Sequence, residues 1–261
     1  MTTKIPREMN SKIVKLPPNI AGTDFVVGDL HGCRHLLDAK LQEYGFNPAI
    51  DRVLSVGDLI DRGPDSWNTL RLIEESWFHF VLGNHEEMLL DLLADRTDRP
   101  LPVDQEAAWI NEIDDDQFDY LRTVLKPILD AAPLAIKVGE TADCFYVLHA
   151  DRSRLSYTSP ISLMSDSELD EIDLATEEQQ EVLLWSRRLA REASRNALGV
   201  EDPKFAEYTK AENLSLTFVG HTVLDRPIFY RGHMNLDTGA YLSGVLTVLM
   251  ANDLMRPRKA A

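Results

Sequence analysis

Five short apolar runs in this chain are each followed at once by a polar side chain, and this pattern constrains the fold more than any other feature. Three of the runs, residues 25–27, 53–56 and 78–82, end at a glycine before the polar residue, and leucines at helical spacing follow the first run. The polar residues after the five runs are Asp29, Asp58, Asn84, His149 and His221. Intervals of 29 and 26 residues separate the first three, about one strand-helix-strand unit each. Because ligands bind beyond the carboxyl ends of strands in such sheets, we expect an α/β fold with these side chains at one rim.

The length and composition favour a single domain. The chain has 261 residues, of which 44% are hydrophobic, enough to bury a core without disulfide bonds. Residues 1–22 are polar and proline-bearing, so we expect an N-terminal arm there and one domain over residues 23–261. No run approaches the roughly 18 uncharged apolar residues of a membrane-spanning helix, so no membrane contact is expected. With only Cys33 and Cys144, and no secretion-like start, the chain is expected in the cytoplasm with reduced thiols.

The charge balance argues against nucleic acid as a partner. The formal net charge is −16, whereas binding to a phosphate backbone depends on clustered Lys and Arg. Salt screens charges beyond about 8 to 10 Å, so bound cations and a few arginines can still make a local site attractive to phosphate. We therefore expect local charge to decide binding, and net charge to act mainly on solubility.

The remaining segments are predicted to form helices that cover the sheet and one last strand. Residues 85–143 have a helical pattern, with Met88, Leu89, Leu92 and Leu93 on one face. Residues 166–181 are strongly acidic and favour a solvated loop and helix start over a calcium site, because their spacing matches no EF-hand loop.

A further helix is expected to begin within the acidic stretch. Thr176 followed by Gln179 resembles a capping box, so this helix is predicted to begin there and continue through Arg188 toward Gly199. Residues 244–250 are predicted to form a final buried strand.

Four fragments occur in an order that is very improbable by chance. They are Gly28-Asp29-Leu30-His31-Gly32, Gly57-Asp58-Leu59-Ile60-Asp61-Arg62-Gly63, Gly83-Asn84-His85-Glu86 and Gly220-His221-Thr222. Together they resemble the signature of the phosphoprotein phosphatase family of metallophosphoesterases. The run from Phe25 to Asp91 is especially similar to the short bacteriophage and bacterial serine/threonine protein phosphatases, and similarity returns at residues 148–151, 184–187, 219–222 and 236–240. This resemblance implies a calcineurin-like fold of two stacked mixed β-sheets flanked by helices.

The resemblance also implies a centre for two divalent metal ions. It assigns Asp29, His31 and Asp58 to the first ion, and Asp58, Asn84, His149 and His221 to the second. A carboxylate can bridge two cations, and the mixed oxygen and nitrogen donors suit Mn, Fe or Zn better than Ca, with Mn our first expectation. Two such ions lower the pKa of a shared water, so a hydroxide could attack phosphorus without a nucleophilic Ser or Cys.

The same resemblance places four catalytic side chains. Arg62 and Arg187 would clamp the phosphoryl oxygens, with Arg188, one residue away, as the alternative to Arg187. His85 would protonate the leaving oxygen, and Asp61 would orient and charge its imidazole.

Each candidate site residue also has an alternative interpretation in which its role is only structural. A single Asp or Asn at a strand end is more often a turn former or helix cap, and a single His is more often a satisfied core residue. Arg187 could instead pair with the acidic segment before it. His35, His79 and His233 match nothing in the family, and we expect structural roles for them. Asp237 begins a turn that we expect to support a metal-ligating histidine.

Three functions remain open from the sequence. The first is a serine/threonine protein phosphatase, with some phosphotyrosine activity, whose partners are phosphorylated proteins. The second is a symmetrical diadenosine tetraphosphate hydrolase, whose relatives typically have Ala-Arg-Gly in place of Asp61-Arg62-Gly63 and Asp in place of Glu86. The third is a non-catalytic metal-binding scaffold. Asp61 favours the phosphatase, and no motif residue is missing, which disfavours the scaffold. The sequence does not indicate an oligomeric state.

Overall fold

Two mixed β-sheets form the centre of the protein. The computed structural model describes residues 12–94, 103–140, 144–155, 161–174, 176–196, 198–199 and 214–255. The seven-stranded sheet has the order β1 (Ile13–Leu16), β5 (Ala135–Val138), β6 (Phe145–Leu148), β8 (Leu216–Val219), β10 (His233–Asn235), β9 (Ile228–Tyr230) and β7 (Leu198–Gly199). The four-stranded sheet has the order β11 (Val248–Met250), β2 (Asp24–Val27), β3 (Arg52–Ser55) and β4 (Phe78–Phe80). Both sheets contain parallel and antiparallel pairs, as the family resemblance implied.

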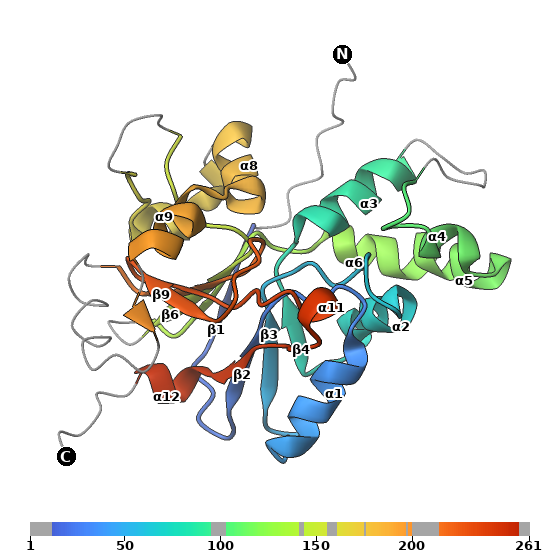
Figure 1. The fold of residues 1–261 in the computed structure, drawn as a ribbon, viewed down its shortest axis with the longest axis horizontal. Coiled ribbons are helices and arrows are strands. Elements are labelled where there is room, and N and C mark those ends of the chain that lie inside the picture. Colours follow the sequence, from blue (N-terminus) through green and yellow to red (C-terminus); the bar gives the residue numbers. More distant parts are fainter. Residues whose placement is uncertain are drawn as a thin grey trace.

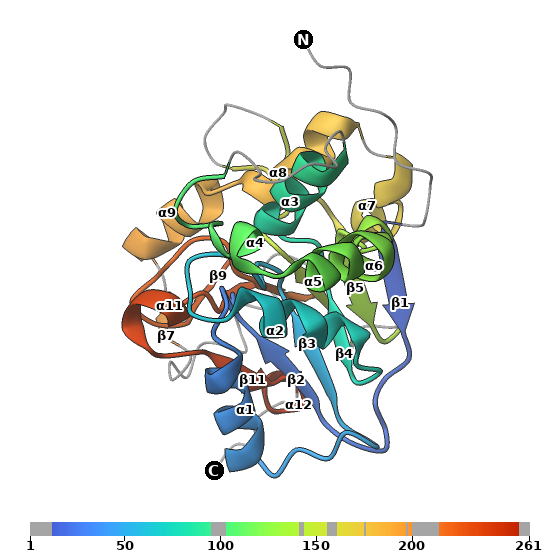
Figure 2. The ribbon, with the colours of Figure 1, turned by 90° about the vertical axis from the view of Figure 1, so that its right-hand side faces the viewer.

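Helices flank the two sheets (Figures 1 and 2). The first group is α1 (Arg34–Glu43), α2 (Ser66–Leu70), α3 (Asn84–Ala94), α4 (Trp109–Glu112), α5 (Asp115–Tyr120) and α6 (Lys126–Asp130). The second group is α7 (Asp166–Asp170), α8 (Glu177–Trp185), α9 (Arg188–Asn196), α11 (Ala240–Ser243) and α12 (Ala251–Met255). Single turns of 3-10 helix at Arg71–Glu74 and Ile172–Leu174, and a π-helical turn at Leu121–Leu125, complete the elements. No helix of the described ranges is long and apolar enough to cross a membrane.

Alternating side chains along the strands build the core. Val26 and Leu54 of the four-stranded sheet meet Phe218 and Met234 of the seven-stranded sheet in one buried cluster. The neighbouring residue Val53 points to the opposite face, where the helices cover the sheet. Burying each such side chain stabilises the fold by about 1.5–3 kcal/mol. Because these strands are buried on both faces, their sequences are continuous apolar runs without polar alternation.

The structure differs from the sequence prediction at the N-terminus. Residues 1–11 lie outside the described part, but Ile13–Leu16 form β1, which pairs in parallel with β5. The expected arm over residues 1–22 therefore includes an edge strand of the sheet. The single lysine of β1, Lys15, hid this strand, because a charged residue in a four-residue edge strand interrupts the apolar pattern.

Four further features depart from the prediction. The predicted helix from Thr176 is interrupted at Ser186 and Arg187, so that α8 ends and α9 begins there. Met88 is 42% exposed, whereas Leu90 is buried in α3. The last strand begins at Val248 instead of residue 244, and β5 lies inside the stretch expected to be helical.

Candidate metal centre

The polar residues that follow β2, β3, β4, β6 and β8 meet at one rim of the two sheets. β2, β3 and β4 are parallel neighbours in one sheet, and β6 and β8 are parallel neighbours in the other. Their carboxyl ends therefore point the same way within each sheet, and the loops after them converge. Contacts at this rim connect the predicted metal ligands and catalytic side chains.

Asp58 lies between two groups of histidines. Its Oδ2 atom is 3.5 Å from Nε2 of His31, and its Oδ1 atom is 3.4 Å from Nε2 of His149. The Asp58 side chain is buried. One carboxylate thus presents a different oxygen to each side, which is the arrangement that a bridging ligand needs.

The second group of donors comes from three separate strand ends. Oδ1 of Asn84 is 2.9 Å from Nε2 of His149 and 2.8 Å from Nδ1 of His221. One atom each of Asp58, His149 and His221 also lie within 4.8 Å of one another. These four residues match the predicted second metal position.

Hydrogen bonds to backbone carbonyls fix which ring nitrogen His31 and His149 present. Nδ1 of His31 donates to the carbonyl of Ile60 at 2.8 Å, and Nδ1 of His149 donates to the carbonyl of Val56 at 2.7 Å. Each ring therefore presents the lone pair of Nε2 to the centre, as a metal ligand must. Burial lowers the pKa of His31 to about 4 and that of His221 to about 3, so both imidazoles are neutral at pH 7.

Asp29 is held by the backbone of the loop after β8. Both of its carboxylate oxygens accept from the N–H of His221, at 3.1 and 2.9 Å. Burial, together with the charges of Asp237 and Asp58, raises the pKa of Asp29 well above its usual range. A Cβ atom at Gly220 would lie 1.9 Å from Oδ1 of Asp29, so only glycine fits beside it.

The donor set fits a pair of divalent cations. Burial and the Asp58 charge also raise the pKa of the nearby Asp237, to about 6. Three acidic side chains are buried close together beside the neutral imidazoles of His31 and His221, so bound cations would offset the repulsion between their carboxylates. The predicted ligands Asp29, His31, Asp58, Asn84, His149 and His221 are the residues that would hold them.

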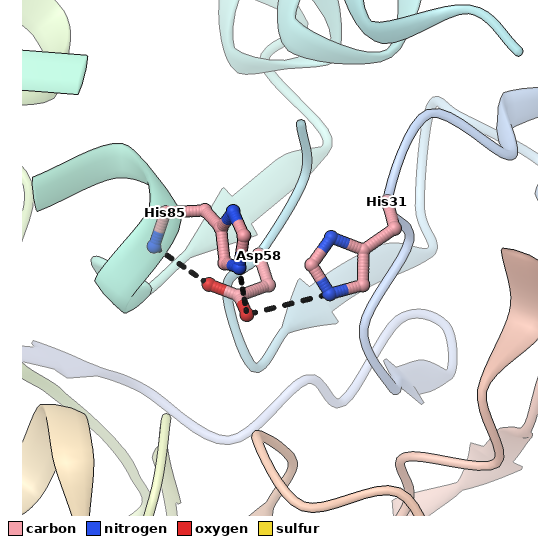
Figure 3. Close-up of side chains that lie close together, drawn as sticks. All are labelled: His31, Asp58 and His85. Atoms are coloured by element: carbon pink, nitrogen blue, oxygen red, sulfur yellow. Dashed lines mark hydrogen bonds and ion pairs between the residues drawn. The ribbon is translucent and has the colours of Figure 1, made fainter. Parts of the chain in front are cut away.

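His85 faces the same space from the start of α3 (Figure 3). Its Nε2 atom is 4.0 Å from Oδ2 of Asp58, so His31, Asp58 and His85 form a second candidate metal-binding group. Its Nδ1 atom is 2.7 Å from Oδ2 of Asp61. Burial lowers the pKa of His85, but the bond to Asp61 and the charge of Asp58 outweigh it and raise the pKa above its ordinary value. This geometry agrees with the predicted acid and its orienting carboxylate, and the roles themselves stay predictions.

Arg62 lies beside His31, a candidate ligand of the first metal ion. Its Nη1 atom is 2.6 Å from Nε2 of His31, its Nε atom donates to Glu106 at 2.9 Å, and its guanidinium lies 5.2 Å from the centre of the Tyr241 ring. Because the donors of a guanidinium are planar and always charged, Arg62 can bind a phosphoryl group at this rim. The sequence offered no sign of Glu106 or Tyr241.

Arg187 reaches the centre from the break between α8 and α9. Its Nη1 atom donates to the carbonyl of His221 at 2.9 Å, whereas Nη1 of Arg188 is 3.4 Å from the carbonyl of Arg154. Of the two candidates, the structure brings Arg187 to the metal ligands. The indole of Trp185 packs at 6.3 Å from the His221 ring beside it.

Backbone strain gathers at this rim. Positive φ angles, which L-residues rarely adopt, occur at His31, Asp58, Asp61, Arg62 and His221. Within the described part of the chain, Arg231 is the only other non-glycine residue with this conformation. Strained backbone clusters where function requires a geometry that packing alone would not choose.

The buried carboxylate of Glu86 supports the loops that carry the ligands. It accepts from the backbone N–H groups of Asp58 at 2.9 Å, Leu59 at 2.8 Å and Gly83 at 3.1 Å. The sequence placed Glu86 inside a motif but gave it no role. His233 lies away from the rim, with Nδ1 at 2.9 Å from the carbonyl of Arg231, as its expected structural role requires.

Comparisons with known proteins agree with this geometry. The family model described as calcineurin-like phosphoesterase matches residues 25–225. Solved structures share the fold: a candidate diadenosine tetraphosphatase has a TM-score of 0.56 and 22% identity, covering 90% of this chain and 91% of that one. A Saccharomyces cerevisiae protein serine/threonine phosphatase has a TM-score of 0.55 and 17% identity, covering 88% of this chain and 72% of that one.

Relatives of two kinds match by sequence. Serine/threonine-protein phosphatase 2 of Salmonella typhimurium is 29% identical over 85% of this chain and 90% of its own length. Serine/threonine-protein phosphatase 1 of the same organism is 56% identical over 27% of this chain, a match that spans 32% of that protein. The symmetrical bis(5'-nucleosyl)-tetraphosphatase of Erwinia tasmaniensis is 42% identical over 27% of this chain and 26% of its own length. The ligand geometry, the two-sheet fold and the family match together show that this chain belongs to the calcineurin-like phosphoesterases, the metal-dependent hydrolases whose signature its strand ends carry.

Proposed function

We propose that this protein is a manganese-dependent serine/threonine protein phosphatase. The observation that carries the proposal is the pairing of His85 with Asp61 at 2.7 Å, because His85 also faces Asp58 at the centre of the ligand set. A protonated imidazole in this place can give its proton to a leaving alkoxide, which phosphoserine and phosphothreonine require.

The chain's own residues would divide the work of phosphoryl transfer. When bound, two divalent cations would neutralise the phosphoryl charge and supply an activated water for in-line attack on phosphorus. Arg62 and Arg187 would bind the equatorial oxygens and align the phosphorus. His85 would hold its proton toward the leaving oxygen, and Asp61 would keep the Nδ1 side of that ring in place.

The substrate class rests on two supports. Asp61 supplies the partner that an acid needs for poor leaving groups, and a relative named as a serine/threonine phosphatase aligns over 85% of this chain. We infer that phosphorylated proteins are the substrates and that phosphotyrosine is also accepted. The cytoplasm is the proposed location, since Cys33 and Cys144 are both unpaired and buried.

A second candidate function is hydrolysis of symmetrical dinucleoside tetraphosphates. A relative with that name is 42% identical over 27% of this chain, and the solved structure of a candidate diadenosine tetraphosphatase shares the fold. Such a reaction expels a nucleoside diphosphate, which is a good leaving group and depends little on a proton donor. The buried pair of His85 and Asp61, which would serve as a proton donor, therefore favours the phosphatase.

A substrate panel tests the proposal directly. Protein purified and loaded with Mn²⁺ is assayed for phosphate release from phosphoserine, phosphothreonine and phosphotyrosine peptides, and for ADP formation from diadenosine tetraphosphate. Higher kcat/KM for the phosphoserine and phosphothreonine peptides is expected, and Asp58→Asn should abolish it. Preference for the dinucleotide would support the second candidate. Failure on 4-nitrophenyl phosphate as well, with manganese bound, would support a non-catalytic scaffold.

A further inference from the structure

A short segment from outside the sequence motifs contacts two side chains of the proposed active site. It comprises residues 103–112, and α4 lies at its end, between α2 and α3 in both views of the fold (Figures 1 and 2). α3 begins with Asn84 and His85, and α2 follows the loop that carries Asp61 and Arg62. The segment can therefore reach both catalytic loops at once.

The indole of Trp109 contacts the carboxylate that orients His85. Nε1 of Trp109 donates to Oδ1 of Asp61 at 2.7 Å, while the other oxygen of Asp61 is 2.7 Å from Nδ1 of His85. The backbone N–H of Asp61 also donates to Oγ of Ser66 at 2.8 Å. Both carboxylate oxygens thus have a donor, and the side chain of Asp61 is only 7% exposed.

We propose that Trp109 is a positioning residue for the proton donor, acting on His85 through Asp61. This inference rests on the proposed function and adds to it a residue from a separate segment. A carboxylate held at one oxygen can still rotate about its Cβ–Cγ bond, whereas donors at both oxygens fix its plane. The imidazole that bonds to the fixed carboxylate then keeps Nε2 aimed at the leaving oxygen, and small losses of such alignment slow catalysis strongly.

The same segment contacts Arg62 through a different side chain. Glu106 accepts from Nε of Arg62 at 2.9 Å, and its backbone carbonyl accepts from the N–H of Arg62 at 2.8 Å. Glu106 therefore acts on phosphate binding, and Trp109 acts on proton transfer. Variants at the two positions should differ in which kinetic quantity they change.

The test compares substrates whose leaving groups differ in their need for a proton. Trp109→Phe keeps an aromatic ring against the core but removes the N–H donor. Loss of a hydrogen bond to a charged group is expected to lower kcat for a phosphoserine peptide about tenfold, while kcat for 4-nitrophenyl phosphate falls less than about twofold. KM for both substrates is expected to stay within about twofold. Glu106→Gln should instead raise KM for both substrates and leave the kcat ratio between them unchanged.

Trp77→Phe serves as the matched control. Trp77 packs against Phe46 and Phe78 at the amino end of β4, the end away from His85. This variant also loses one indole from the core, but its kcat ratio should equal that of the wild type. Because the ratio compares two substrates on one preparation, a partly unfolded fraction does not affect it.

A second readout needs neither metal nor turnover. The Trp109 indole N–H resonance, assigned by its loss in Trp109→Phe, should exchange slowly with solvent and should exchange faster in Asp61→Ala. An equal loss of kcat on both substrates, or a fast-exchanging indole in the wild type, would overturn this inference alone. A wild-type protein inactive on both substrates would overturn the proposed function, and the inference with it.

Discussion

Replacing Glu86 with Gln tests how the ligand loops are held. Glu86 has no exposed surface, and its carboxylate accepts from three backbone N–H groups, one of which belongs to Asp58. Burial and the charge of Asp58 raise the pKa of Glu86 to about 8, which favours the neutral acid near pH 7. The three N–H donors oppose this shift, because they require acceptor oxygens on both sides of the carboxyl group and so hold Glu86 as the carboxylate.

The hydrogen bonds that Glu86 accepts set the expected loss of stability in its variants. Oε2 accepts from Asp58 and Gly83, and Oε1 accepts from Leu59. The amide of Gln has a single acceptor oxygen, so its NH₂ group must face at least one of these N–H donors. A buried N–H left without a partner costs about 1–3 kcal/mol, so we expect Glu86→Gln to lower the free energy of unfolding by about 2 kcal/mol. Glu86→Ala leaves all three donors unpaired and empties the site, and should cost about 5 kcal/mol.

Urea denaturation at pH 7, followed by circular dichroism, measures this loss. Glu87→Gln is the matched control, because Glu87 accepts from the Trp185 indole at 2.8 Å and a Gln oxygen can replace that acceptor. The control should change the free energy of unfolding by less than about 1 kcal/mol. A loss below about 0.5 kcal/mol for Glu86→Gln would instead mean that Glu86 is held as the neutral acid.

The other predictions concern metal binding, catalysis and pH. Asp58→Asn should lower bound manganese, measured by elemental analysis after gel filtration, and abolish phosphatase activity; unchanged metal content would contradict its bridging role. His85→Asn should keep the metal and lower kcat for a phosphoserine peptide about 10²- to 10⁴-fold, and full activity would exclude His85 as the acid. Burial and the neighbouring Arg152 lower the pKa of His233 from 6.5 to about 3. Between pH 3 and 6.5, His233 is therefore protonated in the unfolded chain and neutral in the folded protein. The stability that neutral, folded His233 contributes is fully present above about pH 6.5 and is lost as the pH falls, by about 2 kcal/mol at pH 5. His233→Gln should therefore remove this part of the pH dependence in urea titrations, and an unchanged slope would contradict it.

The candidate metal ligands could be predicted from the sequence because their signal is local. Each follows an apolar strand, and a glycine marks the turn in the first three and at Gly220. The order of the fragments then identified the family, which supplied the assignment of roles. The confirmed fold followed from that family, since strand spacing alone does not specify two sheets.

The supporting residues could not be found because their contacts are distant in the chain. Trp109 reaches Asp61 across 48 residues, within a stretch that reads only as helical cover. The break before Arg187 likewise depends on Asp151, whose Oδ2 accepts from Oγ of Ser186 at 2.8 Å and from the N–H of Leu189 at 3.3 Å. Such contacts arise from the three-dimensional arrangement and leave no periodic trace in the sequence.

Strands with polar residues were also missed. The β9–β10 hairpin contains His233 and Asn235, which are buried but break the apolar pattern. Asn235 donates to the carbonyl of Gly220 at 3.2 Å, so its polarity serves the loop that carries His221. A polar residue buried for this purpose weakens the signal on which strand prediction depends.

Anomalous X-ray diffraction from crystals grown with manganese would show whether Asp58 joins two metal ions. We expect two anomalous peaks roughly 3.5 to 4 Å apart, with one oxygen of Asp58 on each or one shared between them. His31 should coordinate one peak, and His149 and His221 the other. A single peak, or two peaks that Asp58 does not join, would contradict the account.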